Sequence, residues 1–299
     1  MPKERTACIF SDGLFADGEL YFMTPAELKK LFEQQFAAAG IETPAVDAAL
    51  LISETAGISQ LDMILYPERE LLPETETLLH ELAQRRCRRE PLQYITGKAY
   101  FRDLMLSVNP AVLIPRPETE LLVDFALEKT PRNGRLLDIG TGSGAIAIAC
   151  ATERPDLDVT AVDISPAALE TAKANAKANG AENMRFLESD LFSAVEGETF
   201  DFIAANLPYV TEEEYSELAP EVRLHEPVLA LTAPDEGFLL IQKTAEQLQK
   251  HLNPGGRAAF ELSPFQALRL KTLLETLEFS AQISCDLTGR ERFVFAEKQ

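Results

Sequence analysis

The sequence predicts an α/β protein: a mostly parallel, doubly wound sheet preceded by a small helical domain. After Arg135, apolar runs typical of strands alternate with helical stretches, which is the pattern of a parallel sheet with helices on both faces. One of these strands runs into a glycine turn and then a helix, as at the ligand-binding edge of such sheets. Before residue 90, helical periodicity occurs without any strand signal. The length of 299 residues allows two domains.

The N-terminal part is predicted to contain three segments. Residues 1–23 form a loose extension without the charged start and apolar core of a signal peptide. Residues 24–90 form a small helical domain, whose first helix starts with Thr24 as cap and Pro25 in the first turn. Residues 91–114 form an extended or hairpin linker, with turns at Gly97 and Asn109-Pro110.

A rigid loop and a helix start are predicted where the linker ends. Arg116 stands between two prolines, so its backbone is held extended, and Pro117 with Glu118 begins a helix. This helix start is a sufficient structural explanation of the segment. The alternative is that Arg116 supplies a cation to a bound anionic group.

The domain from 115 to 299 is predicted to hold seven strands. Two extended runs at the end, Phe279 to Cys285 and Arg292 to Ala296, read as an antiparallel hairpin joined by the turn Asp286 to Arg290. The strands before them are expected near 135–139, 158–162, 184–188, 200–205 and 256–262. The first and fourth of these strands end at the same edge of a parallel sheet, which is where ligands bind.

The glycine turn after the first strand is a candidate ligand cradle. It consists of Gly140, Thr141, Gly142, Ser143 and Gly144. Glycines allow positive φ and close backbone approach, and the helix that follows offers unpaired N–H groups to an anion. Tight helix–sheet packing is the plain alternative. The spacing also fits a dinucleotide site, so the turn does not separate a methyltransferase from a nicotinamide oxidoreductase.

Acidic residues follow the next two strands. Asp163 is placed to accept hydrogen bonds from two ribose hydroxyls where a strand meets a helix. Asp190 closes the third strand and can accept the hydrogens of an adenine amino group, with Leu191 lying against the base. The alternative for each carboxylate is a helix cap.

The segment Asn206-Leu207-Pro208-Tyr209 follows the fourth strand and is the most specific candidate for catalysis and substrate binding. An amide or exocyclic amino nitrogen is a poor nucleophile and must be held in position. The Asn206 side-chain oxygen can accept one N–H hydrogen, and the carbonyl of Leu207 or Pro208 a second. Pro208 stiffens the turn, and Tyr209 offers the planar group a face. An ordinary Asn-Pro turn is the alternative.

The cradle, the two carboxylates and Asn206 together predict an S-adenosylmethionine-dependent N-methyltransferase. Asn206 is expected to contact both the cofactor and the substrate. The chemistry requires no metal, because the sulfonium carries the leaving-group driving force and positioning contributes most of the rest. No metal site is expected either, since the four cysteines and three histidines are scattered without ligand spacing.

The charge of the chain disfavours a nucleic-acid substrate. It has 28 Lys plus Arg against 48 Asp plus Glu, and a formal net charge of −20, whereas nucleic-acid enzymes need a basic surface. The run Arg85 to Arg89 is the local exception. We expect it to be the solvated last turn of a helix, with a docking surface for an acidic partner as the alternative.

The chain resembles the HemK-type protein-(glutamine-N5) methyltransferases, and the likeness covers nearly everything from Thr24 onward. The stretch 112–123, Val-Leu-Ile-Pro-Arg-Pro-Glu-Thr-Glu-Leu-Leu-Val, is strongly specific when joined to Asn206-Leu207-Pro208-Tyr209. The glycine cradle is only weakly specific. Further matching segments are Gln93 to Gly97, Phe101, Asp138 to Gly144, Val162 to Ser165, Glu226-Pro227, Asp235 to Gly237 and Asp286 to Arg290.

The resemblance implies a class I methyltransferase fold, Rossmann-like, with the terminal antiparallel hairpin. It implies methyl transfer from S-adenosylmethionine, with S-adenosylhomocysteine as product, to the glutamine of the Gly-Gly-Gln motif in class I peptide-chain release factors. It also implies that the helical domain recognises the release factor. We expect a monomer in the cytoplasm, with neither a membrane nor a nucleic acid as direct partner.

One departure from the family keeps alternatives open. The second position of its Asn-Pro-Pro-Tyr motif is Leu207 here, a form that also occurs in adenine dimethyltransferases of ribosomal RNA. A glutamine methyltransferase for a ribosomal protein and a nucleic-acid N-methyltransferase therefore stay as alternatives. A nicotinamide oxidoreductase is a more remote one, supported only by the glycine spacing.

Overall fold

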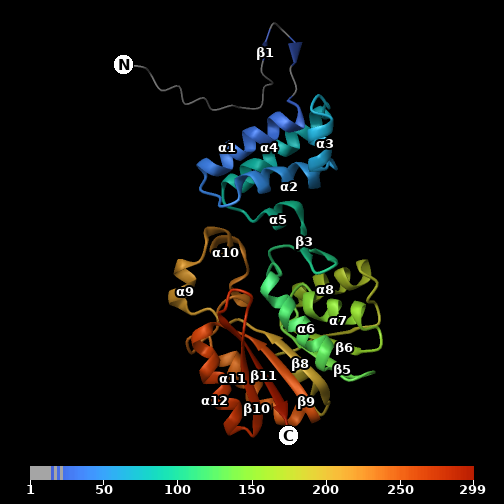
Figure 1. The fold of residues 1–299 in the computed structure, drawn as a ribbon, viewed down its shortest axis with the longest axis vertical. Helices are drawn as coiled ribbons and strands as arrows, with labels where there is room; N and C mark the ends of the chain where they lie inside the picture. Colours follow the sequence, from blue (N-terminus) through green and yellow to red (C-terminus); the bar gives the residue numbers. More distant parts are fainter. Residues whose placement is uncertain (1–14, 17–18, 21–22) are drawn as a thin grey trace. The chain divides into compact units, whose positions relative to one another are not determined.

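The computed structural model describes residues 15–16, 19–20 and 23–299, which fall into two compact units, Met1–Thr96 and Gly97–Gln299 (Figure 1). Most of the expected N-terminal extension, with Cys8, lies outside the described residues. Of that extension the structure describes strands β1 (Phe15–Ala16) and β2 (Glu19–Leu20), which pair antiparallel.

The first unit is a helical bundle. Thr24 caps α1 as expected: its hydroxyl accepts from the Glu27 N–H at 3.3 Å, and the Glu27 carboxylate accepts from the Thr24 N–H at 2.9 Å. Apolar side chains at helical spacing, among them Leu28, Phe32 and Phe36, fill its core. The helices described in this unit are α1 (Pro25–Ala38), α2 (Pro44–Ala56), α3 (Gln60–Leu65), α4 (Pro73–Cys87) and α5 (Leu92–Thr96).

The arginines at the end of α4 are engaged within this unit. Arg86 is buried, and its Nε lies 2.7 Å from Oδ2 of Asp47 on α2. The expectation of a solvated last turn is therefore wrong for Arg86, because α2 packs against α4 and covers it. Arg85 pairs with Glu90, and Arg89 donates to the carbonyls of Ala39 and Gly40.

The predicted linker 91–114 needs a correction. Its first part is the helix α5, whose Leu92, Tyr94 and Ile95 are buried. Burial of these side chains outweighs the extended preference of a β-branched and aromatic run. The hairpin that we expected follows as β3 (Lys98–Phe101) and β4 (Leu104–Ser107), and it belongs to the second unit.

A sheet of seven described strands organises the second unit, in the order β10-β11-β9-β8-β5-β6-β7. Strands β5 to β9 run parallel, and β11 inserts antiparallel between β9 and β10. The predicted class I methyltransferase fold with its terminal antiparallel hairpin is confirmed. The strands are β5 (Arg135–Ile139), β6 (Asp158–Asp163), β7 (Arg185–Glu188), β8 (Phe200–Asn206), β9 (Leu252–Glu261), β10 (Phe279–Cys285) and β11 (Glu291–Lys298).

Helices cover both faces of this sheet (Figure 1). Alternate residues of a strand point to opposite faces, so Phe202 and Ala204 of β8 pack in one core and Ile203 and Ala205 in the other. The core that contains Phe202 lies under α6 (Glu120–Lys129), α7 (Ala145–Glu153) and α8 (Pro166–Ala178). The core that contains Ile203 lies under α11 (Leu239–His251) and α12 (Pro264–Thr276).

Shorter elements surround the carboxyl ends of the strands. The single turn η1 (Pro117–Thr119) leads into α6, and η2 (Ser193–Val195) follows β7. The connection from β8 to α11 contains α9 (Glu212–Glu217), α10 (Pro220–His225) and η3 (Val228–Ala230). Among the helices that the structure describes, none is both long and apolar enough to cross a membrane.

Candidate functional site

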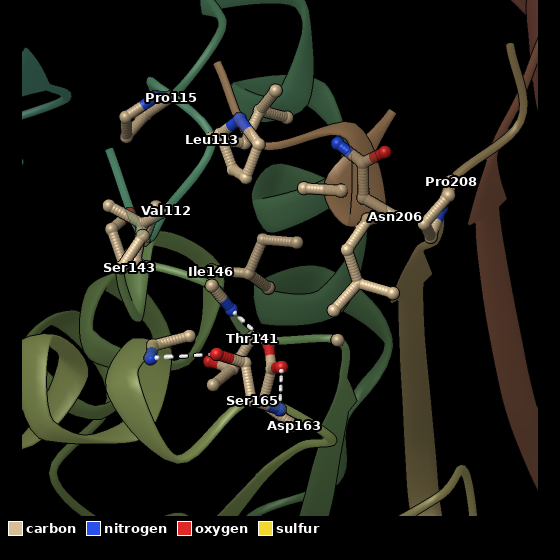
Figure 2. A pocket seen from close by; sticks show the side chains of 18 of the residues that line it. Val112, Leu113, Pro115, Thr141, Ser143, Ile146, Asp163, Ser165, Asn206 and Pro208 are labelled. Carbon is tan, nitrogen blue, oxygen red and sulfur yellow. Dashed lines mark hydrogen bonds between the residues drawn. The ribbon is translucent and has the colours of Figure 1, made fainter. Parts of the chain in front are cut away.

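A cavity of about 250 Å³ opens at the carboxyl ends of β5, β6 and β8 (Figure 2). The glycine turn and Asp163 form one side of it, and Asn206 with Pro208 forms another. Further lining residues come from the segment before α6 and from the segment after α10: Ala111, Val112, Leu113, Pro115, Arg116, Thr119, Pro227, Leu229 and Ala230. Of the predicted site residues, Gly140, Thr141, Gly142, Ser143, Asp163, Asn206 and Pro208 line this cavity.

The three glycines of the turn all have positive φ, but their surroundings differ. A Cβ on Gly144 would lie 2.6 Å from Ile148 Cδ1 and 3.3 Å from Ala172 Cβ, so this glycine permits close packing of α7 and α8. A Cβ on Gly140 would lie 3.0 Å from Leu207 Cδ2. Gly142 has a φ of +57° and no neighbour nearer than 4.0 Å to such a Cβ. Gly142 is therefore the position where a ligand can approach the backbone most closely.

The Asp163 carboxylate orders the cradle from the end of β6. Its Oδ2 accepts from the Gly142 N–H and its Oδ1 from the Ser165 N–H, both at 2.9 Å. Burial raises the pKa of this carboxyl, against the effect of those two hydrogen bonds. Each carboxylate oxygen keeps a lone pair beyond these bonds, so Asp163 can also accept from two ligand hydroxyls.

Asp138 is a buried support that the sequence reasoning did not assign. The Thr141 hydroxyl donates to its Oδ2 at 2.6 Å, and burial raises the pKa of the Asp138 carboxyl to about 7. The Ser143 carbonyl is held from α8, where Asn175 Nδ2 donates to it at 2.9 Å. The cradle is thus fixed by buried side chains on β5 and α8 as well as by its own glycines.

Asn206 is the last residue of β8, and its amide is held on one side only. Its Nδ2 donates to Thr119 Oγ1 at 3.1 Å, and the Thr119 hydroxyl donates to Glu261 Oε2 at 2.7 Å. Burial raises the pKa of the Glu261 carboxyl to about 7, although the hydrogen bond from Thr119 favours its charged form. With one Nδ2 hydrogen donated to Thr119, the Asn206 side-chain oxygen is oriented as an acceptor for a ligand.

Tyr209 and Leu207 line a second cavity of about 560 Å³, which Asn206 also borders. Leu113, Arg116, Asn206 and Ala230 border both cavities, so the two meet at Asn206. The Leu207 side chain is buried in the core of the sheet. Tyr209 is partly buried against the same core, and the loss of solvent around it raises the pKa of its phenol.

The mouth of the first cavity is held by a buried carboxylate. Glu226 accepts from the Ile114 N–H at 3.1 Å and pairs with Arg116 Nη2 at 2.5 Å. The Glu226 side chain is 1% exposed, whereas that of Arg116 is 33% exposed. The cation that we considered for a bound anion is therefore paired with Glu226, and this pair joins the loop before η1 to the segment after α10.

Three predicted cofactor residues lie outside the lining of both described cavities: Gly144, Asp190 and Leu191. Asp190 is exposed just after β7, and Leu191 is buried with a φ of +51°. Their assignment stays a prediction.

No sequence signal indicated a role for Thr119, Glu226 or Glu261, although the first two lie in segments that carried the family resemblance. In the described part of the chain, no three His, Cys, Asp or Glu side chains are grouped as a metal site.

Known proteins resemble this chain over most of its length. The "Methyltransferase small domain" model matches residues 117–251, and the "PrmC N-terminal domain" model matches residues 27–97. A release factor glutamine methyltransferase of Deinococcus radiodurans is 37% identical over 91% of this chain and 99% of its own. One from Koribacter versatilis is 43% identical over 79% of this chain and 86% of its own.

The likeness to solved structures concerns the fold. A methyltransferase from Pyrococcus furiosus matches with a TM-score of 0.51 at 21% sequence identity. The match covers 66% of this chain and 90% of that one.

Proposed function

Because the chain belongs to the release factor glutamine methyltransferase family, we propose that it methylates the side-chain amide nitrogen, N5, of the glutamine in the Gly-Gly-Gln motif of class I release factors. It is an S-adenosylmethionine-dependent protein-glutamine methyltransferase. The observation that carries the proposal is the side-chain oxygen of Asn206, held at the meeting point of two cavities.

The first cavity suits S-adenosylmethionine. Gly142 leaves open space where the methionine part can approach the backbone, and Asp163 has lone pairs for the ribose hydroxyls. The start of α7 presents N–H groups to the carboxylate. When bound, the cofactor supplies an electrophilic methyl: the amide nitrogen lone pair forms the new N–C bond, the S–C electron pair stays on sulfur, and one N–H proton passes to water.

The second cavity suits the glutamine side chain. One amide hydrogen would go to the Asn206 oxygen and the other to a backbone carbonyl of Leu207 or Pro208, which turns the nitrogen lone pair toward the first cavity. Tyr209 borders the second cavity and offers the planar amide a face. We further propose that the helical domain, residues 24–90, recognises the release factor.

Asp163→Ala should weaken S-adenosylmethionine binding by roughly 1–3 kcal/mol, because it removes charged hydrogen bonds to the ribose. Calorimetry on the folded variant measures this loss. Asp158→Ala is the matched control, since that carboxylate lies at the opposite end of the same strand. Equal affinity for the Asp163 variant and the wild type would remove Asp163 from the site.

Methyl transfer to naked RNA or DNA should be negligible even at low salt, where attraction to phosphate is strongest. The net charge of −20 opposes nucleic-acid binding, and Arg85, Arg86 and Arg89 are engaged within their own unit. The measurement is incubation with labelled S-adenosylmethionine and, separately, release factor, ribosomal protein or ribosomal RNA. Robust labelling of RNA would favour the nucleic-acid alternative that Leu207 leaves open.

A further inference from the structure

A buried hydrogen-bond chain runs from Glu261 through Thr119 to Asn206. The register of the parallel strands β8 and β9 places Asn206 beside Glu261. Thr119, at the end of η1, reaches both: it donates to Glu261 at 2.7 Å and accepts from Asn206 at 3.1 Å. Thr119 is 4% exposed and Glu261 is 2% exposed, so the bond between them is largely shielded from water, although Thr119 borders the first cavity and Glu261 the second.

The direction in which these hydrogen bonds are donated decides which atom of the Asn206 amide meets a ligand. An ionised carboxylate only accepts, so the single hydroxyl hydrogen of Thr119 must go to Glu261. The lone pairs of the hydroxyl then accept from Nδ2, and Oδ1 is left for the ligand. If Glu261 donated instead, Thr119 could donate to Oδ1, and the amide would turn its N–H group toward the substrate nitrogen. Such an amide could not hold a primary amide hydrogen.

We propose that Thr119 and Glu261 are positioning residues that fix the Asn206 amide with its oxygen toward the glutamine nitrogen. The inference rests on the proposed function and adds to it the residues that orient the acceptor. Neither residue needs to touch the reacting atoms, because both act through Asn206.

The charge on Glu261 is therefore part of the positioning. Two effects on the pKa of the Glu261 carboxyl oppose one another. Burial is the larger and raises this pKa to about 7, whereas the hydrogen bond from Thr119 lowers it. The other groups facing Glu261 are Arg292 from β11, Arg116 and Glu118 from the loop and η1, and Tyr209 after β8. Protonation gives the Glu261 carboxyl a hydrogen that it can donate to Thr119, so the direction of the hydrogen bonds is no longer fixed. The rate constant kcat should therefore fall as the pH drops through about 7.

Three variants test this. Thr119→Val keeps the shape without the hydroxyl and should lower kcat on the order of tenfold through misplaced substrate. Calorimetry should show a much smaller loss of cofactor affinity, although Thr119 borders the first cavity. Thr119→Ser should restore kcat. Glu261→Gln keeps an acceptor oxygen that does not titrate, so its kcat should lose the step near pH 7. Thr244→Val is the matched control, because it removes a buried hydroxyl on α11 that donates to the Leu240 carbonyl.

A second readout needs no substrate. The side-chain amide NMR signal of Asn206, identified by its loss in Asn206→Asp, should shift with pH around 7 in the wild type. The shift should be absent in Glu261→Gln.

Two results would overturn the inference. If Thr119→Val keeps the wild-type kcat and pH profile while Asn206→Ala is impaired, the Thr119 chain is only structural and the proposed function stands. If the wild-type protein does not methylate glutamine, the proposed function falls, and the inference falls with it.

Discussion

Asn206→Ala should lower the methyl-transfer rate by roughly 10²-fold or more while the fold and much of the cofactor affinity persist. The substitution removes the oxygen that holds one hydrogen of the glutamine amide, so the nitrogen is no longer aimed at the methyl group. Single-turnover kinetics with release factor measures the loss. Asn253→Ala is a suitable control, because it removes an asparagine that donates to Asp201 at 2.7 Å near the start of β9, away from both cavities.

Asn206→Asp is the sharper companion test. It retains shape and an acceptor but adds charge and loses the donor to Thr119. If Asn206 acts only by accepting a hydrogen bond, the aspartate variant should keep measurable activity, between those of alanine and wild type. An alanine variant that stays fully active would reduce Asn206 to an ordinary turn residue at the end of a strand.

Gly237→Ala should be strongly destabilising and should displace the backbone of Tyr209. A Cβ at Gly237 would lie 2.0 Å from the Tyr209 carbonyl oxygen and 2.9 Å from Gln266 Nε2, which donates to that oxygen. Overpacking costs about 1–3 kcal/mol, and the φ of +73° adds a further cost of about 1–2 kcal/mol for a non-glycine residue. The free energy of unfolding in urea measures the sum of these two costs.

The matched variant Gly255→Ala separates the two effects. Gly255 has a φ of +72°, and a Cβ there would meet nothing within 4 Å, so only the conformational cost applies. Methyl transfer should fall in the Gly237 variant and persist in the Gly255 variant. Equal stability losses in the two would show that Gly237 does not support Tyr209 by close contact.

Much of the fold could be predicted because the signals are local. Apolar runs ended by an acid, a glycine or, for β8, Asn206 marked the strands β5 to β9, and the turn after Cys285 marked the hairpin. Helix α5 could not be predicted, since Tyr94 and Ile95 favour an extended chain and are helical only through burial. The prediction that Arg86 is solvated was wrong for a similar reason, because its partner Asp47 lies 39 residues away in the sequence.

In the candidate site, too, the residues with a local sequence signal could be predicted and the others could not. Gly142, Asp163 and Asn206 could be placed because each ends a strand or forms the turn after it. Their supports come from distant segments: Thr119 and Glu261 are 142 residues apart, and Arg116 and Glu226 are 110 residues apart. No local pattern connects such pairs, although Arg116, Thr119 and Glu226 lie in segments of the family resemblance. Whether Asp190 and Leu191 contact the adenine stays a prediction.

The central claim is that Asn206 presents a glutamine amide to the methyl donor, and mapping the methylated atom tests it most directly. Release factor is incubated with the protein and S-adenosylmethionine, digested, and sequenced by tandem mass spectrometry. We expect one added methyl group on the side-chain amide nitrogen of the glutamine in Gly-Gly-Gln, and far less of this product in the same reaction time when the protein carries Asn206→Ala. A methyl group on any other residue, or no methylation of the release factor by the wild-type protein, would contradict the claim.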